Sequence, residues 1–592
     1  MKKLMTGNEA IARGVYEAGV VYASAYPGTP STEILENLAH HKDIVAEWAP
    51  NEKVALESAL GASMAGVRAL AAMKHVGVNV AADPLMTMGY TGITGGFLLV
   101  SADDPGCHSS QNEQDNRYYA KFAKIACLEP STPQECLDFM REAYKISESY
   151  DSPVLIRMTT RVCHSKGLVE TGLRKEVEPT AYTRQASKYI ANPGNARIRR
   201  PMVEERLQKL ADYSESSPLN VLEDYGNTLG IITAGVSYSY VKEVFGDSAD
   251  ILKIGFSFPL PIKKIERFIA SHDKVYVVEE LEPFMEEQIK AAGLSVIGKE
   301  LIPSMGELNP DIIKEKLLGE VAETIKADPE LLVGRPPILC AGCPHRGFFY
   351  ELGKKRNVVI TGDIGCYTLG GAPPLNATDS VICMGASLSM GHGAKKALEK
   401  TGSDKKVVGV IGDSTFLHSG MTSLLNAVYN NSSTVNVILD NRVTAMTGHQ
   451  QNPGTGYTLQ EDPANQVDLE AIVRALGVKK VLRVNPLMLE ETRSAINEAL
   501  EYDQGPSVII TRWPCAIKKF SQQDLEEFDL DRPHCRVIVE DCRGCKNCVR
   551  TGCPSISFDK EAKKAYIDPT MCVGCTVCLQ SCPFDAIERV GV

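Results

Sequence analysis

The chain has 592 residues, of which 44% are hydrophobic and 23% charged, so it is too long for one core and we expect three or four globular domains. Its formal net charge of -11 gives no basic surface for nucleic acid, and no apolar run reaches the roughly eighteen residues that cross a bilayer. No apolar segment follows Lys2 and Lys3, so we expect no secretion signal and a cytoplasmic location. In that reducing compartment the 18 cysteines are expected to be ligands or catalytic groups rather than disulfides.

Predicted strands and helices alternate from residue 8 to about residue 166. Residues 19–38 indicate a strand, a Pro/Gly turn and a helix, and residues 95–106 a strand that ends in an acidic loop. The polar stretch 170–225 predicts a linker or an arm. A second α/β segment begins at 230–235, and a third opens after 333–337 and continues to about 525. The fold class is therefore α/β and multidomain, with doubly wound parallel sheets and a cysteine-dense α+β tail.

Two cysteine runs form the tail, "CRGCKNCVRTGCP" (542–554) and "CVGCTVCLQSCP" (572–583). They resemble bacterial ferredoxins, in which each 4Fe-4S cluster takes three thiolates from one run and the fourth from the other. Short predicted strands at 555–560 and 564–569 would fold the halves together. The resemblance implies two ligand sets, the first being Cys542, Cys545, Cys548 and Cys582, and the second Cys572, Cys575, Cys578 and Cys553. The first run departs from the ferredoxin pattern by one extra residue before Cys553. The alternative is a zinc ribbon, which would leave four of the eight cysteines without a role.

A possible cofactor site lies in residues 407–448, which predict a strand, a helix and a second strand. Asp413 ends the first strand and Asn441 follows the second, so both lie at the edge where open α/β sheets bind ligands, and together they could hold Mg²⁺. The spacing resembles the GDG…NN signature of thiamine diphosphate enzymes, with Ser414 replacing the second Gly and Asp440 the first Asn. This resemblance implies Mg²⁺ ligands at Asp413, Asn441 and the Val443 carbonyl, with Gly412 and Ser414 beside the cofactor. The alternative is a plain α/β unit in which Asp413 only caps a helix.

The N-terminal half resembles 2-oxoacid:ferredoxin oxidoreductases in two places. Glu52, in "APNEKVALESALGASMAG" (49–66), would be the carboxylate that protonates the thiamine pyrimidine ring. Thr29, in "YPGTPSTE" (26–33), would lie near the reactive carbon. The simpler alternative for Glu52 is an acidic residue that favours a helix N-terminus.

Two further segments carry weaker predictions. In "GASLSMGHG" (385–393), the backbone N–H groups of Gly385, Ala386 and Ser387 are expected to reach the diphosphate, since small residues allow close approach. In "HSSQNEQDNR" (108–117), Asn112, Gln114 and Arg117 could face a substrate carboxylate or coenzyme A. A solvated loop is the alternative for the second segment.

A third cluster is implied by cysteines outside the tail. "ILCAGCPHRG" (338–347), "GDIGCYTLG" (362–370) and "VIITRWPC" (508–515) resemble the proximal cluster site of the same enzymes. The implied ligands are Cys340, Cys343, Cys366 and Cys515. A zinc site that includes His345 would leave Cys366 unexplained. Six cysteines fit no motif and are expected as small buried hydrophobic residues, namely Cys107, Cys127, Cys136, Cys163, Cys383 and Cys535.

Together these phrases resemble the large (alpha) subunits of the indolepyruvate:ferredoxin oxidoreductase family over nearly the whole chain. The resemblance implies five parts: 1–180, pyrimidine-type thiamine domain; 181–225, linker or arm; 226–330, transketolase-C-like domain; 331–525, diphosphate- and Mg-binding domain with the proximal cluster; 536–592, two-cluster ferredoxin domain. It also implies a small beta subunit in an α2β2 assembly.

The activity that this resemblance implies is oxidative decarboxylation of aryl 2-oxoacids to aryl-acyl-coenzyme A and CO2, with electrons passed to ferredoxin. The implied cofactors are thiamine diphosphate, Mg²⁺ and three 4Fe-4S clusters. The alternatives are an enzyme for pyruvate or a branched-chain 2-oxoacid, a non-oxidative thiamine decarboxylase, and an electron-transfer subunit without thiamine chemistry. The cluster motifs disfavour the decarboxylase, and the presence of Glu52, Asp413 and Asn441 disfavours the electron-transfer subunit.

Overall fold

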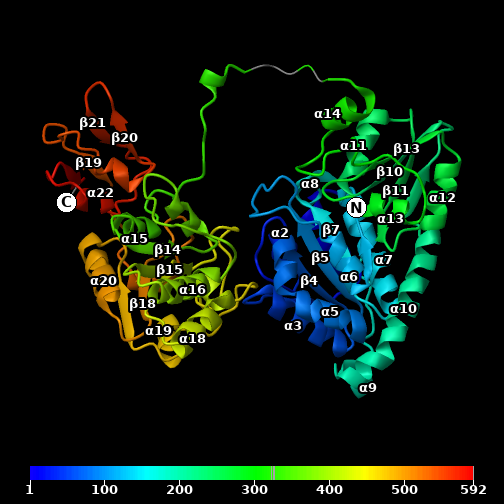
Figure 1. Ribbon diagram of the computed structural model, residues 1–592, viewed down its shortest axis with the longest axis horizontal. Helices are drawn as coiled ribbons and strands as arrows, with labels where there is room; N and C mark the ends of the chain where they lie inside the picture. The colour runs from blue at the N-terminus through cyan, green and yellow to red at the C-terminus, as the bar shows by residue number, and fades with distance from the viewer. Residues whose placement is uncertain (322, 324–326, 591–592) are drawn as a thin grey trace. The chain divides into compact units, whose positions relative to one another are not determined.

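The computed structural model describes residues 1–321, 323 and 327–590, which fall into two compact units (Figure 1). The first unit is Met1–Lys326 and the second is Ala327–Val592. Within the described residues, no helix is long and apolar enough to cross a membrane.

A seven-stranded sheet forms the centre of the first unit, in the order β12-β6-β7-β5-β4-β2-β3. Every neighbouring pair is parallel except β12 with β6. The strands β4, β5 and β7 are buried at almost every position, as expected for strands covered on both faces. The strand bounds are β2 (Tyr22–Ala25), β3 (Val45–Trp48), β4 (Ala69–Lys74), β5 (Phe97–Asp103), β6 (Ala126–Leu128), β7 (Val154–Thr159) and β12 (Phe256–Phe258).

Eight helices accompany this sheet among the described residues. The predicted site residues follow two of its strands, with Thr29 in the turn after β2 and Glu52 at the start of the helix after β3. The helix bounds are α1 (Gly7–Glu17), α2 (Thr32–Leu38), α3 (Glu52–Met64), α4 (His75–Val80), α5 (Ala82–Thr91), α6 (Arg117–Ala123), α7 (Pro133–Tyr150) and α8 (Thr160–His164). A separate antiparallel pair, β1 (Lys2–Thr6) with β8 (Lys166–Glu170), joins the two ends of this segment.

A smaller four-stranded sheet, in the order β13-β10-β11-β9, completes the first unit. Its strands are β9 (Asn220–Glu223), β10 (Leu229–Ala234), β11 (Asp250–Ile254) and β13 (Lys274–Val278). Its helices are α11 (Val236–Phe245), α12 (Ile262–Ala270), α13 (Phe284–Ala291) and α14 (Pro310–Ile313), with a π-helical turn, η1 (Lys314–Leu318), after the last. β9 runs antiparallel to β11, while the other pairs are parallel.

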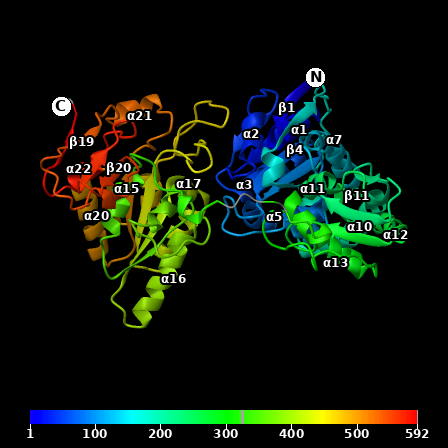
Figure 2. The same cartoon turned by 90° about the horizontal axis from the view of Figure 1, so that it is seen from above.

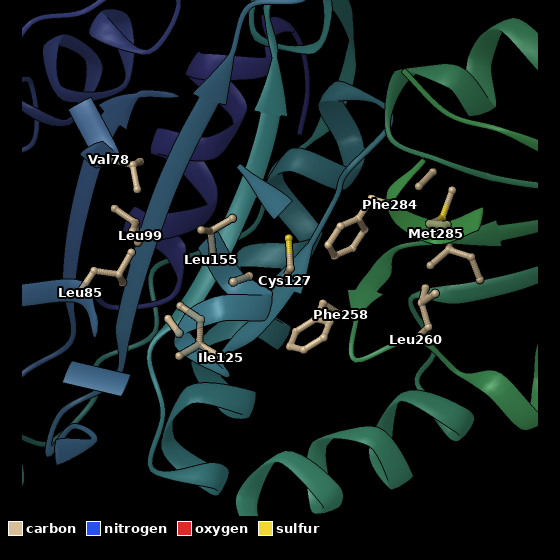
Figure 3. Close-up of a cluster of buried hydrophobic side chains, with 14 of the residues drawn as sticks. Val78, Leu85, Leu99, Ile125, Cys127, Leu155, Phe258, Leu260, Phe284 and Met285 are labelled. Carbon is tan, nitrogen blue, oxygen red and sulfur yellow. The ribbon is translucent and has the colours of Figure 1, made fainter. Parts of the chain in front are cut away.

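One hydrophobic core joins the two sheets of the first unit (Figure 3). It includes Leu99, Leu155 and Phe258 from the larger sheet together with Phe284 and Met285 of α13. Because β12 also pairs with β6, the predicted pyrimidine-type and transketolase-C-like parts are packed as one body.

The segment predicted as a linker or an arm, 181–225, differs from that expectation. It contains α9 (Ala186–Tyr189) and the 24-residue helix α10 (Pro193–Ser216), which Figure 1 shows along the flank of the first unit. The buried residues of α10 are Val203, Arg206, Leu210 and Ser214, so its buried stripe is narrow and half polar. The stripe gives no clear helical period of apolar residues, and Pro201 within the helix interrupts the pattern further.

The second unit contains a five-stranded parallel sheet in the order β14-β15-β16-β18-β17. Its strands are β14 (Val358–Thr361), β15 (Lys406–Gly412), β16 (Val435–Asp440), β17 (Lys480–Val484) and β18 (Ser507–Arg512). The helical elements before β15 are η2 (Pro329–Leu331), α15 (His345–Leu352), η3 (Cys366–Gly371) and α16 (Ala386–Lys400). The later ones are α17 (Asp413–Thr415), η4 (Phe416–Gly420), α18 (Met421–Tyr429), α19 (Leu469–Ala475), α20 (Leu489–Glu501) and α21 (Gln522–Glu527).

The tail forms a small antiparallel domain at the end of the second unit. As predicted, β20 (Ile556–Asp559) pairs with β21 (Lys564–Ile567), and the ends of the domain are joined by β19 (Cys535–Val537) and β22 (Ile587–Arg589). Two short helices, η5 (Val549–Thr551) and α22 (Val577–Gln580), lie within the cysteine runs. In Figures 1 and 2 this domain lies beside α15, which contacts η5.

Candidate active site and electron-transfer sites

Glu52 is the first residue of α3, and the helix begins there because the Asn51 side chain accepts a hydrogen bond from the Val54 N–H at 2.9 Å. The Glu52 side chain is almost fully buried and lies against the first turn of α4. A methyl group at Gly77 would be 2.6 Å from Glu52 Oε1. Gly77 therefore makes the space that the Glu52 carboxyl occupies, a role that the sequence reasoning missed.

Thr29 lies half-buried in the turn that follows β2. Ser31 donates from its backbone and its hydroxyl to the Gly28 carbonyl, and Asn8 Nδ2 donates to the Pro30 carbonyl at 2.7 Å, which fixes the turn from both sides. A methyl group at Gly28 would be 3.1 Å from Lys74 Cβ. The structure thus brings the Thr29 turn to the end of β4, whose next helix packs against Glu52.

The loop 108–117 is mostly a structural connection. Gln114 donates to the side chains of Asn79 and Asn116, and Arg117 is fully buried. Arg117 Nη1 lies 2.7 Å from Glu279 Oε2, and the other guanidinium nitrogens donate to the Asp115 carboxylate. The Arg117 Cζ atom lies 4.9 Å from the centre of the Phe284 ring. The expectation that Arg117 faces a substrate carboxylate is therefore wrong, because its charge is used to join the two sheets of the first unit.

Asp413 and Asn441 lie side by side at the carboxyl ends of β15 and β16. The Asp413 carboxyl accepts hydrogen bonds from the backbone N–H groups of Ser414, Arg442 and Val443. Burial raises the pKa of Asp413 well above its usual range, and the charge of Asp440 raises it further. The amide oxygen of Asn441 is buried without a hydrogen-bond partner among the described residues.

These groups fit a divalent cation. A buried carboxyl beside a second acid and an amide oxygen without a partner is a donor set that Mg²⁺ would satisfy. The Val443 carbonyl, from a residue only 5% exposed, belongs to the same turn. Asp440 occupies the position where the signature has Asn. Its Oδ2 lies 3.6 Å from Arg512 Nε, so the guanidinium offsets part of the carboxylate charge.

The segment 385–387 is held by Asp363, a residue that the sequence reasoning quoted but did not use. Asp363 is fully buried and accepts hydrogen bonds from the Gly385 N–H at 2.8 Å and the Ser387 N–H at 3.0 Å. The Ala386 N–H donates to the Cys383 carbonyl at 3.1 Å. In this conformation the three N–H groups therefore bind protein oxygens, and the structure does not offer them to a diphosphate as predicted.

Tyr367 fixes the distance between the loop after β14 and the loop after β15. Its hydroxyl donates to the Ile364 carbonyl at 2.6 Å and lies 2.8 Å from Thr415 Oγ1. Methyl groups at Gly365 or Gly412 would overlap its ring. Gly412 thus provides space for Tyr367, and Ser414 accepts from Thr444 Oγ1 at 2.9 Å.

The four cysteines of the predicted proximal site come together from three parts of the second unit. Cys340 and Cys343 precede α15, Cys366 begins η3, and Cys515 follows β18. Burial raises the pKa of Cys343 to about 12 and of Cys366 to about 11, and the neighbouring Cys515 thiol adds to both shifts. Cys340 likewise acts on Cys366 and Cys515, so each of the four thiols is close to another. Backbone N–H groups of His345, Ile517 and Lys518 point at these sulfurs.

The tail encloses two cavities, and each is lined by cysteines from both runs. The first includes the three cysteines 542, 545 and 548 together with Cys582. The second includes Cys572, Cys575 and Cys578 together with Cys553. The extra residue before Cys553 is taken up by η5 and by Gly552, whose φ is +71°. The structure therefore groups the thiols in the crossed pattern that the ferredoxin resemblance implies.

No three His, Cys, Asp or Glu residues are spaced to hold a single metal ion in the part of the chain that the structure describes. A four-iron cluster separates its thiolates by the width of an iron–sulfur cage, and the cysteine-lined cavities suit that larger group.

The proximal site contacts the second tail cavity directly. A methyl group at Gly342 would overlap Val573, which stands between Cys572 and Cys575. Arg346 is fully buried and donates to the carbonyls of Leu339, Cys340 and Thr551 at 2.6–2.8 Å. Arg346 thus ties the CAGC loop to the tail domain, with no carboxylate among its partners in the described residues.

Three protein families match parts of the chain. Residues 363–511 match the thiamine pyrophosphate enzyme C-terminal TPP binding domain, and residues 541–586 match the 4Fe-4S dicluster domain. Residues 13–219 match the thiamine diphosphate-binding family of pyruvate flavodoxin/ferredoxin oxidoreductases. The last match continues through α10, so this helix belongs with the N-terminal part. The predicted thiamine-binding and ferredoxin-type folds are confirmed.

Full-length relatives give a narrower assignment. The chain is 42% identical over 632 residues to the indolepyruvate oxidoreductase subunit IorA of Pyrococcus horikoshii, covering 100% of this chain and 97% of the relative. It is 42% identical to IorA of Archaeoglobus fulgidus over 99% of this chain and 97% of the relative. The 2-oxoglutarate synthase subunit KorA of Methanothermobacter marburgensis is 25% identical over 53% of this chain and 97% of the relative. The chain belongs to the IorA family of indolepyruvate oxidoreductase subunits, thiamine-diphosphate-dependent members of the 2-oxoacid:ferredoxin oxidoreductases.

Proposed function

We propose that this chain catalyses the oxidative decarboxylation of aryl 2-oxoacids such as indolepyruvate to the aryl-acyl-coenzyme A and CO2. The observation that carries the substrate class is the 42% identity to an indolepyruvate oxidoreductase subunit over the full length, against 25% identity to a 2-oxoglutarate synthase subunit over 53% of the chain. Thiamine diphosphate, when bound, supplies a carbon nucleophile and an electron sink for loss of CO2.

Each unit carries residues to which the proposal assigns a cofactor role. In the first unit, Glu52 would hold the proton that activates the pyrimidine ring, at a position set by Gly77 and Asn51. Thr29 would contact the reacting group from a turn that is fixed on both sides. In the second unit, Asp413, Asn441 and the Val443 carbonyl would bind Mg²⁺ and, through it, the diphosphate.

The second unit would also carry the electrons away. Oxidation of the decarboxylated substrate releases two electrons, and a 4Fe-4S cluster accepts one at a time. The proximal cysteines would hold the first cluster, and the close approach of Gly342 to Val573 supports an adjacent site for the next cluster. From the tail the electrons would pass to external ferredoxin.

Arg346 supports this electron path because it is a buried cation between two sites for anionic groups. A buried charge without an opposite charge beside it is costly, and thiolate-ligated clusters carry net negative charge. The clusters would balance the guanidinium, while the guanidinium would favour their reduced forms.

The partner of this chain is proposed to be a small beta subunit in an α2β2 assembly, in line with relatives that are named as subunits. A cytoplasmic location follows from the thiolate ligand sets, which a reducing compartment protects. Pyruvate and branched-chain 2-oxoacids are the alternative substrates. Enzymes that act on them need the same cofactor and clusters.

The test is a substrate panel with the chain and its beta subunit, purified without oxygen and supplied with coenzyme A and ferredoxin. Reduction of ferredoxin is measured with indolepyruvate, phenylpyruvate, pyruvate and 2-oxoisovalerate. We expect the aryl acids to give the highest kcat/KM, and omission of coenzyme A to abolish the acyl product. A higher kcat/KM for pyruvate or 2-oxoisovalerate would contradict the substrate proposal. Failure to bind thiamine diphosphate would instead favour an electron-transfer subunit.

A further inference from the structure

Cys535 lies outside both cysteine runs, and the sequence predicts it only as a small buried residue. The structure places it on β19, paired with Arg589 of β22, with no exposed surface. It lines the cavity of the second tail site together with Cys553, Cys572, Cys575 and Cys578. That cavity therefore contains five cysteines, whereas a 4Fe-4S cluster needs four.

The contacts of Cys535 are with the cluster cysteines themselves. Its backbone N–H donates to Cys572 Sγ at 3.3 Å. Its thiol is near enough to the thiols of Cys572 and Cys578 for both to shift its pKa. Strand pairing at both ends of β19 holds the Cys535 backbone, so its thiol is directed at the site without any rearrangement of the chain.

The first tail cavity provides an internal comparison. The described residues that line it include only four cysteines, which are those of its own ligand set. Val537, the last residue of β19, brings an apolar side chain to that cavity instead of a thiol. The two sites thus differ by one spare sulfur, which the second site has and the first lacks.

We propose that Cys535 is a reserve ligand of the second cluster, able to bind the iron atom that Cys572 holds when that thiolate is displaced. The proposal rests on the cluster sites of the proposed function. In the exchange, the iron–sulfur bond to Cys572 breaks as the bond from Cys535 forms. The proton of the Cys535 thiol passes to the Cys572 sulfur, so no electron is gained or lost. The cluster keeps four thiolate ligands and its four irons throughout.

The experiment compares the full chain with Cys572→Ala, Cys535→Ser and the double variant, all purified without oxygen. Iron and acid-labile sulfide per chain are measured, with EPR spectra of the oxidised and reduced protein. We expect Cys572→Ala to retain the four-iron signal of the second cluster. We expect the double variant to lose about four irons or to show a three-iron signal. Cys545→Ala is the matched control, because the first tail cavity has no spare cysteine. We expect this variant to lose the four-iron cluster of the first site.

The outcomes separate this inference from the proposed function. If Cys572→Ala and the double variant lose the second cluster equally while the unmodified chain is fully loaded, the reserve-ligand proposal is wrong and the proposed function stands. If the unmodified chain holds no tail clusters, the proposed function fails first. Cys535→Ser keeps the size of the side chain, and loss of the cluster in this single variant alone would also contradict a reserve role.

Discussion

At the scale of single residues, the catalytic proposal depends on one buried carboxyl group. Glu52→Gln keeps the size of the side chain and its contact with Gly77, but removes the proton that the proposal requires. We expect turnover to fall by roughly 100- to 10,000-fold, the usual contribution of general acid–base groups. Thiamine diphosphate and iron contents should remain unchanged. The matched control is Glu57→Gln, an exposed residue of the same helix, and equal activity in the two variants would refute the role of Glu52.

Gly77 tests whether the position of that carboxyl matters. In Gly77→Ala the new methyl group would be 2.6 Å from Glu52 Oε1, so the carboxyl must move. We expect a loss of kcat of about tenfold or more with the fold retained, because small misplacements of reacting groups are costly. Gly61→Ala is the control, since Gly61 is in α3 and a methyl group there meets nothing within 4 Å. Equal kcat in both variants would show that Glu52 tolerates the shift.

Glu280 gives a prediction on stability and pH. It is buried after β13, its Oε1 accepts a hydrogen bond from the Leu308 N–H at 3.0 Å, and burial raises its pKa from 4.5 to about 7. Between those values the folded state binds more protons than the unfolded state, so this group lowers stability as pH rises from about 4.5 to about 7. Glu280→Gln should remove that loss, on the order of 3 kcal/mol at pH 8.

Thermal unfolding at pH 5 and pH 8 checks the prediction. The gain in Tm from Glu280→Gln should be larger at pH 8 than at pH 5, while the exposed control Glu243→Gln should change neither value. An equal gain at both pH values would mean that the Glu280 carboxyl does not titrate in this range.

At the scale of elements, the contact between the CAGC loop and the tail carries the electron path. Gly342→Ala adds a methyl group that overlaps Val573, and its φ of +69° adds strain of about 1–2 kcal/mol. We expect slower reduction of the tail clusters after mixing with substrate, measured by stopped-flow absorbance. Gly402→Ala is the control, because its φ is +73° and a methyl group there meets nothing within 4 Å. If both variants reduce their tail clusters at the wild-type rate, the electrons do not cross at this contact.

The elements also show what the sequence could and could not indicate. The strands that end at Asp103 and Gly412 and the β20–β21 pair were predicted, because apolar runs and turn residues mark them locally. Helix α10 was not predicted, because its buried stripe includes Arg206 and Ser214. Tertiary contacts, rather than periodicity, keep that helix in place.

The same contrast applies to the site. Resemblance to known cluster motifs grouped twelve cysteines from the sequence, but it missed Cys535, which reaches the second tail cavity through the pairing of β19 with β22. The roles of Gly77, Asp363 and Arg346 could not be predicted, because each depends on a partner far along the chain or on space that only folding creates. Arg117 was assigned to the substrate for the same reason, since its partner Glu279 is 162 residues away.

At the scale of the whole molecule, each unit holds part of the chemistry. The first unit, 1–326, contains Glu52 and Thr29, and the second, 327–592, contains the proposed cation ligands and all twelve motif cysteines. The second unit alone therefore contains every residue that the proposal assigns to Mg²⁺ and to the clusters.

The measurement that tests this account most directly is the number of irons and acid-labile sulfides per chain in protein purified without oxygen. We predict about twelve irons, four for each of three clusters, with Cys340→Ser lowering the number to about eight. About eight irons in the fully loaded unmodified chain would contradict the account. In that case Cys340, Cys343, Cys366 and Cys515 would hold no cluster, and the electrons would need another route to the tail.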